Sequence, residues 1–161
     1  FQYGALLNSL TVGENIALPL EMHTDLPRAQ INQIIRLRLD SVSLEGTQDR
    51  MPSELSGGMR KRVALARAMA LDPEILFCDE PSAGLDPVTA AEIDRLLLTL
   101  NRSLGITIVI VTHELLSINR LDGRLIMLNG GQVVFSGTVE EAQRSKHSVV
   151  YPFFHPGEAS P

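Results

Sequence analysis

Two short apolar runs on either side of a helical pattern constrain the fold of this chain most strongly. Residues 75–78 are apolar and residues 106–112 are rich in β-branched side chains, as expected for two buried strands. Between them, Asp86 and Pro87 predict the start of a helix and Gly105 predicts its end. Because a strand–helix–strand order favours a parallel sheet, the sequence predicts an α/β fold.

The first part of the chain is predicted to be helical. Thr11 and Glu14 have the spacing of a capping box, so a short helix should begin at Thr11 and be limited by Pro19. A second helix is expected after Pro27, with apolar residues at steps of three and four. A third helix is expected from about residue 59 to residue 71.

The last part of the chain predicts a β-hairpin followed by a helix start. Residues 124–128 and 132–135 read as strands, and the glycine-containing segment 129–131 reads as the turn between them. Thr138 begins a second capping box. The tail, residues 145–161, contains prolines without helical periodicity, so an extended arm or a disordered segment is expected.

Composition excludes several classes of protein. The net charge of −5 argues against a general nucleic-acid binder, which usually carries a basic face. No apolar stretch reaches the roughly 18 residues of a membrane span. The single cysteine, Cys78, lies in an apolar run and is expected to be buried and reduced. The sequence begins at Phe1 without a methionine, which indicates a chain truncated at its N-terminus.

Two adjacent carboxylates, Asp79 and Glu80, follow the first apolar run. Ligands of open α/β sheets bind outside the carboxyl ends of the strands. Because neighbouring side chains of a strand point to opposite faces, one carboxylate could hold the shell of a Mg²⁺ ion while the other meets a water. That division provides the metal holder and the water activator of a phosphoryl-transfer site. Taken alone, the pair is equally an ordinary exit from a strand into a loop.

A glycine turn, Ser56-Gly57-Gly58, precedes the third predicted helix. Glycines leave backbone N–H groups accessible, and a helix N-terminus adds a positive dipole, so an anion is expected to bind there. The plain alternative is a glycine-containing helix entry. The basic run that follows, residues 60–62, is interpreted as a solvated helix face.

Three further residues are candidates because of their positions. His113 directly follows the second apolar run, a setting that the other histidines lack. Asp86 ends the loop segment 82–86, for which simple helix capping is the plain alternative. Gln2 is a candidate only because of its position near the start of the chain.

In their order and spacing, these segments resemble the nucleotide-binding domain of ABC transporters. The resemblance covers nearly the whole chain, with Met59 where Gln is more usual. The five motifs are a Q-loop at residues 1–2, a signature motif at 55–59, a Walker B motif at 75–80, a D-loop at 82–86 and an H-switch at His113.

The resemblance implies three catalytic residues, one further metal-binding residue, and ATP and Mg²⁺ as cofactors. Asp79 would hold Mg²⁺, and Glu80 would be the general base for the attacking water. His113 would contact the γ-phosphate and hold the closed state. Gln2 would sense Mg²⁺ and the attacking water and couple the site to a permease.

The resemblance also implies partners. Ser56, Gly57 and Gly58 would contact the γ-phosphate of ATP bound to the second subunit of a homodimer, and Asp86 would act across the same interface. A transmembrane permease would bind the segment after Gln2, and an accessory regulatory protein could bind the tail. The protein would be cytoplasmic and peripheral on the inner face of the bacterial cytoplasmic membrane, without a nucleic-acid partner.

One element of the family pattern does not occur in residues 1–161, namely the phosphate-binding Walker A motif Gly-x-x-x-x-Gly-Lys-Ser/Thr. The aromatic residue that stacks on adenine is missing too. The expected fold is therefore a P-loop NTPase (RecA-like) core lacking its Walker A strand and helix, plus the ABC α-helical subdomain. We expect an open slot in the sheet, exposed apolar edges, poor ATP binding and no hydrolysis by this piece alone.

These expectations divide the chain, as a partial ABC ATPase domain over residues 1–161, into three parts. Residues 11–71 would form the helical subdomain with the signature motif, and residues 72–145 would form the RecA-like α/β part. Residues 146–161 would be a C-terminal extension.

Four functions compete. Several stretches, among them residues 51–68 and 79–87, are similar to the ATPases of phospholipid-trafficking transporters tied to organic-solvent resistance. The main hypothesis is accordingly an ATPase that powers lipid transport, and the first alternative is the ATPase of another importer, such as an amino-acid system. A non-transport ABC ATPase and a catalytically dead regulatory module are the remaining alternatives.

Overall fold

The computed structural model describes residues 6–158 and divides the chain into two compact units. Unit 1 is Phe1–Thr112 and unit 2 is His113–Pro161. The division falls within the predicted α/β part, directly after the second strand. Over the described residues, no helix combines the length and the apolar character needed to cross a membrane.

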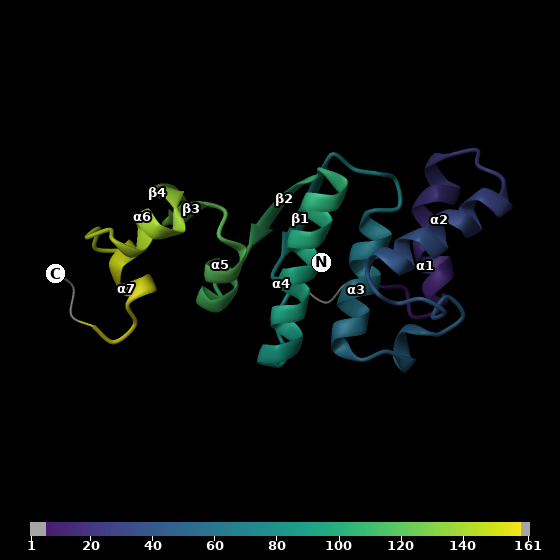
Figure 1. Cartoon of the computed structure of the whole chain (residues 1–161), viewed down its shortest axis with the longest axis horizontal. Helices are drawn as coiled ribbons and strands as arrows, with labels where there is room; N and C mark the ends of the chain where they lie inside the picture. Colours follow the sequence, from purple (N-terminus) through teal and green to yellow (C-terminus); the bar gives the residue numbers. More distant parts are fainter. Residues whose placement is uncertain (1–5, 159–161) are drawn as a thin grey trace. The chain divides into compact units, whose positions relative to one another are not determined.

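Unit 1 begins with three helices that pack on one another: α1 (Val12–His23), α2 (Arg28–Ser41) and α3 (Gly57–Ala68) (Figure 1). The capping box at Thr11 is confirmed, because its hydroxyl accepts from the Glu14 N–H at 3.2 Å and the Glu14 carboxylate accepts from the Thr11 N–H at 2.7 Å. A short 3₁₀ helix, Pro52–Glu54, leads toward α3. The buried core of these helices includes Val12, Ile16, Leu20, Ile31, Ile35, Leu39, Val42 and Val63.

Pro19 does not limit the first helix as expected, since α1 continues to His23. A proline inside a helix removes one backbone hydrogen bond and costs about 3 kcal/mol. The residues before and after it, Ile16 and Leu20, are both buried against the neighbouring helices. Burial of this apolar face on both sides of Pro19 offsets the local penalty.

The rest of unit 1 is a strand–helix–strand segment. Strands β1 (Ile75–Asp79) and β2 (Thr107–Val111) pair in parallel, with Asp79 opposite Val111. Helix α4 (Pro87–Leu104) connects them and packs on α3. Its predicted ends are confirmed: Asp86 caps the start, and Gly105 ends the helix in the left-handed conformation with φ of 66°.

The two strands are not buried on both faces, contrary to the prediction. In β1 the side chains alternate: Leu76 and Cys78 are buried, whereas Phe77 is 75% exposed. Val111 of β2 is 61% exposed. Within the described part of unit 1 only one face of this two-stranded sheet is packed, and the exposed apolar strand residues that we expected are therefore present.

Unit 2 contains a short helix, a hairpin and two more short helices. Helix α5 (Leu115–Leu121) precedes strands β3 (Arg124–Asn129) and β4 (Gln132–Thr138), which pair antiparallel as predicted. The capping box of Thr138 is confirmed at the start of α6 (Val139–Gln143). Ile118, Val139, Ala142, Val150 and Phe154 form the core of this unit.

The described part of the tail is neither extended nor disordered, contrary to expectation. Residues Val150–Phe154 form helix α7, in which Val150 and Phe154 are buried. The ring of His155 stacks on Tyr151 with a centroid distance of 4.3 Å. The side chains of Val150 and Phe154 pack against the hairpin and α6 and stabilise this helix. Five residues are too few for a helical pattern to be recognised in the sequence.

Two leucines on α2 provide a matched test of this core. Leu39 is 1% exposed and Leu37 is 59% exposed. Leu39→Ala should lower the free energy of unfolding by about 2–5 kcal/mol, because it removes buried methyl groups and leaves a cavity. Leu37→Ala should change it by less than about 0.5 kcal/mol. Denaturant unfolding of both variants checks this, and equal effects would contradict the core assignment.

Candidate nucleotide-binding and hydrolytic site

The predicted glycine turn is the N-terminus of α3. Ser56 caps the helix, and its hydroxyl accepts from the Met59 N–H at 3.2 Å. The helix therefore begins at Gly57, two residues before the predicted start. Ser56 is exposed, Gly57 is half-buried and Gly58 is buried. An anion could approach the free N–H groups of the first helical turn from the exposed side.

The two glycines of this turn pack closely against the segment that leads into α4, and the fit is tightest at Gly58. A Cβ atom at Gly58 would lie 2.6 Å from the Thr89 Cγ2 methyl, and one at Gly57 would lie 3.3 Å from Leu85 Cδ2. Both residues of the turn thus contact the segment that carries Asp86. The first helical residues of α3 and the first residues of α4 are held side by side in unit 1.

Asp86 is the N-cap of α4. Its Oδ1 accepts from the backbone N–H groups of Val88 and Thr89 at 3.0 and 3.1 Å, and its Oδ2 accepts from the Thr89 hydroxyl at 2.5 Å. The hydrogen bonds from Thr89, side chain first, hold the pKa of the Asp86 carboxyl below its ordinary value. The carboxylate is therefore ionised at neutral pH.

The two predicted carboxylates lie at the carboxyl end of β1, as expected. Asp79 is the last residue of the strand and is exposed, and Glu80 follows in a left-handed conformation with φ of 47°. This conformation is rare for a residue with a side chain, and the next residue, Pro81, restricts the backbone of Glu80 further. The extended conformation of the strand therefore ends at Asp79.

Three hydrogen bonds fix Glu80 in this conformation. Its N–H donates to the Val111 carbonyl at 2.8 Å, which extends the pairing of the two strands by one residue. The Thr112 hydroxyl donates to the Glu80 Oε2 at 3.0 Å. The Lys61 ammonium donates to the Glu80 main-chain carbonyl at 3.1 Å.

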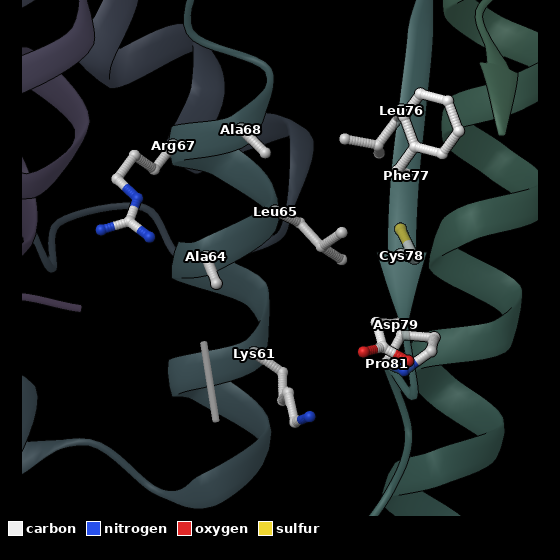
Figure 2. Close-up of a pocket in the computed structure, with 10 residues that line it drawn as sticks. All are labelled: Lys61, Ala64, Leu65, Arg67, Ala68, Leu76, Phe77, Cys78, Asp79 and Pro81. Carbon is white, nitrogen blue, oxygen red and sulfur yellow. The ribbon is translucent and has the colours of Figure 1, made fainter. Parts of the chain in front are cut away.

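A cavity of about 130 Å³ lies between α3 and β1 (Figure 2). Leu65 points from α3 toward the strand, and Lys61 lies near its carboxyl end, close to Asp79 and Pro81. Cys78 also lines the cavity, and burial raises the pKa of its thiol to about 11. This position agrees with the buried, reduced cysteine expected from the sequence.

The basic run 60–62 is only partly the solvated face expected from sequence, because Arg60 is exposed whereas Lys61 and Arg62 are half-buried. Arg60 donates to the Leu55 carbonyl at 2.7 Å, and Lys61 donates to Glu80. Arg62 donates to the Val42 carbonyl at 3.1 Å and pairs with Glu92 at 3.0 Å. The three cations thus bind different segments of unit 1.

Two of the candidate residues do not belong to the described part of unit 1. Gln2 lies outside the described residues. His113 is the first residue of unit 2 and is exposed, so its predicted role stays a prediction. Sequence reasoning missed Lys61 and Thr112, which hold the candidate base. Helical spacing could have indicated Lys61, because it shares one face with Ala64, Leu65 and Ala68.

The donor set near Asp79 fits a metal ion that arrives with a nucleotide. Among the described residues, no group of three or more His, Cys, Asp or Glu side chains could hold a metal ion. Mg²⁺ is usually held by one or two carboxylates together with phosphate oxygens and waters. The single exposed carboxylate of Asp79 meets that requirement, whereas a resident metal cage would need more ligands.

The family model described as "ABC transporter" matches residues 1–83, which is just over half of the chain. The chain belongs to the ABC transporter family. The matched segment contains the glycine turn, β1 and both carboxylates. It supports the P-loop NTPase fold class, and the solved structures below agree with it.

Curated relatives are methionine import ATP-binding proteins. The chain is 45% identical over 141 residues to MetN of Haemophilus influenzae, covering 88% of this chain and 41% of that protein. It is 41% identical over 160 residues to MetN of Xanthomonas euvesicatoria, covering 99% and 44%. The chain thus spans about two-fifths of the length of these relatives. Their names favour the importer alternative over the lipid-trafficking subfamily that we expected.

Two solved structures are similar in fold. The dimeric ATP-binding cassette MJ0796, in a post-hydrolysis state bound to ADP and Pi, matches with a TM-score of 0.74 and 34% identity over 86% of this chain and 61% of its own. The structure of cbiO1 from Clostridium perfringens, part of the ABC transporter complex cbiONQ, matches with a TM-score of 0.79 and 31% identity, covering 88% and 56%. Both confirm the fold class of an ABC ATPase domain.

The contact between Gly58 and Thr89 gives a test of the glycine turn. Gly58→Ala should destabilise the protein by about 1–3 kcal/mol, because the new methyl overlaps the Thr89 Cγ2 atom. The double variant Gly58→Ala with Thr89→Ser should recover most of that loss, since serine removes the methyl and keeps the hydroxyl bound to Asp86. Thermal unfolding of both single variants and the double variant measures the recovery. No recovery would show that the contact does not require glycine.

Proposed function

We propose that the natural protein binds and hydrolyses ATP as the nucleotide-binding subunit of an ABC transporter. The single observation that supports this best is the left-handed Glu80, whose carboxylate accepts from Thr112 at the carboxyl end of β1. Glu80 has a strained backbone and a carboxylate held in place, which suits a residue that activates a water. The exposed carboxylate of Asp79 beside it suits a residue that binds a metal ion. The relatives carry the names of ATP-binding proteins, which supports the same activity.

In the proposed reaction Glu80 accepts a proton from the water that attacks the γ-phosphorus of ATP. The bond from the attacking oxygen to phosphorus forms as the bond to the β-bridging oxygen breaks, and the products are ADP and phosphate. His113 contacts the γ-phosphate, and Gln2 positions the water and relays the state of the site. Thr112 orients the Glu80 carboxylate toward this water.

Asp79 is proposed to hold the Mg²⁺ ion that accompanies ATP, because its exposed carboxylate can bind the ion together with phosphate oxygens and waters.

 Held by Asp79, Mg²⁺ would draw charge from the phosphate oxygens. Ser56, Gly57 and Gly58 contact the γ-phosphate of ATP held by the second subunit, through the N–H groups at the start of α3. Asp86 acts at the same interface of the proposed homodimer.

A substitution at Glu80 tests the proposed base in the natural, full-length protein. Glu80→Gln keeps the size of the side chain and an oxygen that can accept from Thr112, but it removes the proton acceptor. The turnover number for ATP should fall by about 10²–10⁴-fold, while nucleotide binding is retained. Glu45→Gln, in an exposed loop, is the matched control. Steady-state phosphate release measures turnover, and unchanged release in Glu80→Gln would remove Glu80 as the base.

We propose that the transported molecule is a small amino acid such as methionine. Support comes from the names of the relatives, which are methionine import proteins at 41–45% identity. Phospholipid trafficking is the second candidate, supported by the resemblance of residues 51–68 and 79–87. The ATPase subunit does not itself contact the transported molecule, so the choice between the two depends on the permease.

The proposed partners are a second copy of the subunit, a transmembrane permease and an accessory regulatory protein. The permease would bind the segment after Gln2, and the subunit would lie on the inner face of the bacterial cytoplasmic membrane. The similarity to cbiO1, which is described as part of a transporter complex, supports a permease partner. Helix α7 and its exposed neighbours offer a surface for the accessory protein.

Purification of the natural protein from membranes tests the partners and the transported molecule together. We expect a permease to copurify, and we expect ATP turnover of the reconstituted complex to rise with L-methionine and its carrier protein. Phospholipid-dependent stimulation without a response to methionine would favour lipid trafficking instead. Copurification of no membrane protein would contradict the transporter assignment.

A further inference from the structure

Lys61 connects the helix of the glycine turn to the backbone of the candidate base. It lies on the face of α3 that also carries Ala64, Leu65 and Ala68, and this face looks toward β1 (Figure 2). The Lys61 ammonium donates to the Glu80 carbonyl at 3.1 Å and is half-buried. A charged donor strengthens such a hydrogen bond where water is partly excluded.

The carbonyl that Lys61 binds belongs to the peptide between Glu80 and Pro81. Because Glu80 is in the left-handed region, its backbone gains free energy by relaxing toward an extended conformation. Relaxation would rotate the carbonyl away from the ammonium and move the Cβ atom of Glu80. The carboxylate would then leave its position beside the Thr112 hydroxyl.

We propose that Lys61 is a positioning residue for Glu80, and this inference rests on the proposed role of Glu80 as general base. Lys61 acts on the main-chain carbonyl, and Thr112 acts on the carboxylate, so the two hold the residue at both ends. The proposed role of Lys61 is exerted through the main chain of Glu80, at the carbonyl that its ammonium binds. Its removal should therefore slow the hydrolytic step without weakening the binding of ATP.

The same bond links two parts of the proposed mechanism. Ser56 at the start of α3 would meet the nucleotide of the second subunit, and Lys61 on the same helix holds the base for the nucleotide of its own subunit. A displacement of α3 along its axis would move the ammonium relative to the Glu80 carbonyl. One rigid helix thus couples the interface to the position of the base.

Turnover in the natural, full-length protein tests this inference. Lys61→Met should lower the turnover number about tenfold at an unchanged KM for ATP, because one charge-assisted hydrogen bond is lost. Lys61→Arg keeps a cationic donor and should retain most of the turnover. Arg36→Met, on the exposed face of α2, is the matched control for the exchange of a cation for methionine. If Lys61→Met does not fold, Lys61→Gln takes its place.

Chemical rescue separates a positioning role from a purely structural one. Lys61→Ala enlarges the adjacent cavity of about 130 Å³, so ethylammonium should enter it and restore turnover. Ethanol at the same concentration and ionic strength should not. Hydrogen exchange at the Glu80 amide, which donates to Val111, should accelerate in Lys61→Ala and slow again with ethylammonium.

Three outcomes would overturn the role of Lys61: an unchanged turnover number in Lys61→Met, a raised KM with unchanged turnover, or equal rescue by ethanol and ethylammonium. The parallel Glu80→Gln variant keeps this failure separate from failure of the proposed function. If Glu80→Gln is inactive while Lys61→Met is fully active, only the role of Lys61 is wrong. If Glu80→Gln is active, the role of Glu80 as base is wrong as well.

Discussion

The close approach of α3 to α4 at Gly58 and Thr89 determines where the candidate groups of unit 1 lie. A side chain at position 58 would overlap the Thr89 methyl at 2.6 Å, so only glycine allows the two helix starts to meet at this distance. The contact places the Ser56 cap near the Asp86 cap. It also sets the distance of α3 from β1, because α4 follows β1 in the chain and packs on α3.

Glu80 shows a conflict between local preference and tertiary structure that is typical of functional sites. A glutamate before a proline disfavours the left-handed conformation, yet Glu80 has φ of 47°. The bond from its N–H to Val111 continues the parallel ladder, and the bonds from Thr112 and Lys61 hold the rest of the residue. The strain at this position is maintained by three residues, two at the end of β2 and one on α3, so the geometry of the carboxylate depends on how these two elements pack against β1.

Local chemistry predicted the features that depend on few residues. The caps at Thr11, Asp86 and Thr138, the hairpin and the end of α4 at Gly105 were all evident from sequence, since each depends on a side chain or a φ value within one turn. Features that depend on distant contacts were not. Pro19 is tolerated because its helix is buried on both sides of it, and α7 forms because its apolar residues pack on another element.

At the candidate site, too, local features were predicted from sequence and features that depend on distant contacts were not. Asp79, Glu80 and the glycine turn were evident because their spacing along the chain carries the pattern. Lys61 was not recognised because it lies in a basic run. Its partner is a main-chain carbonyl nineteen positions later, and a pattern of side chains does not predict a bond to the main chain. The strands were expected to be buried on both faces, but burial depends on which elements cover the sheet, and sequence runs of apolar residues do not give that information.

The position of Asp86 limits how it can take part in a dimer interface. A carboxylate has roughly four acceptor positions. Bonds from Val88, Thr89 and the Thr89 hydroxyl occupy two positions on Oδ1 and one on Oδ2. One position on Oδ2 remains, so the proposed role of Asp86 at a dimer interface is compatible with its cap on α4. Because Thr89 also contacts the Gly58 position, a donor bound there would act on the same segment that fixes the start of α3.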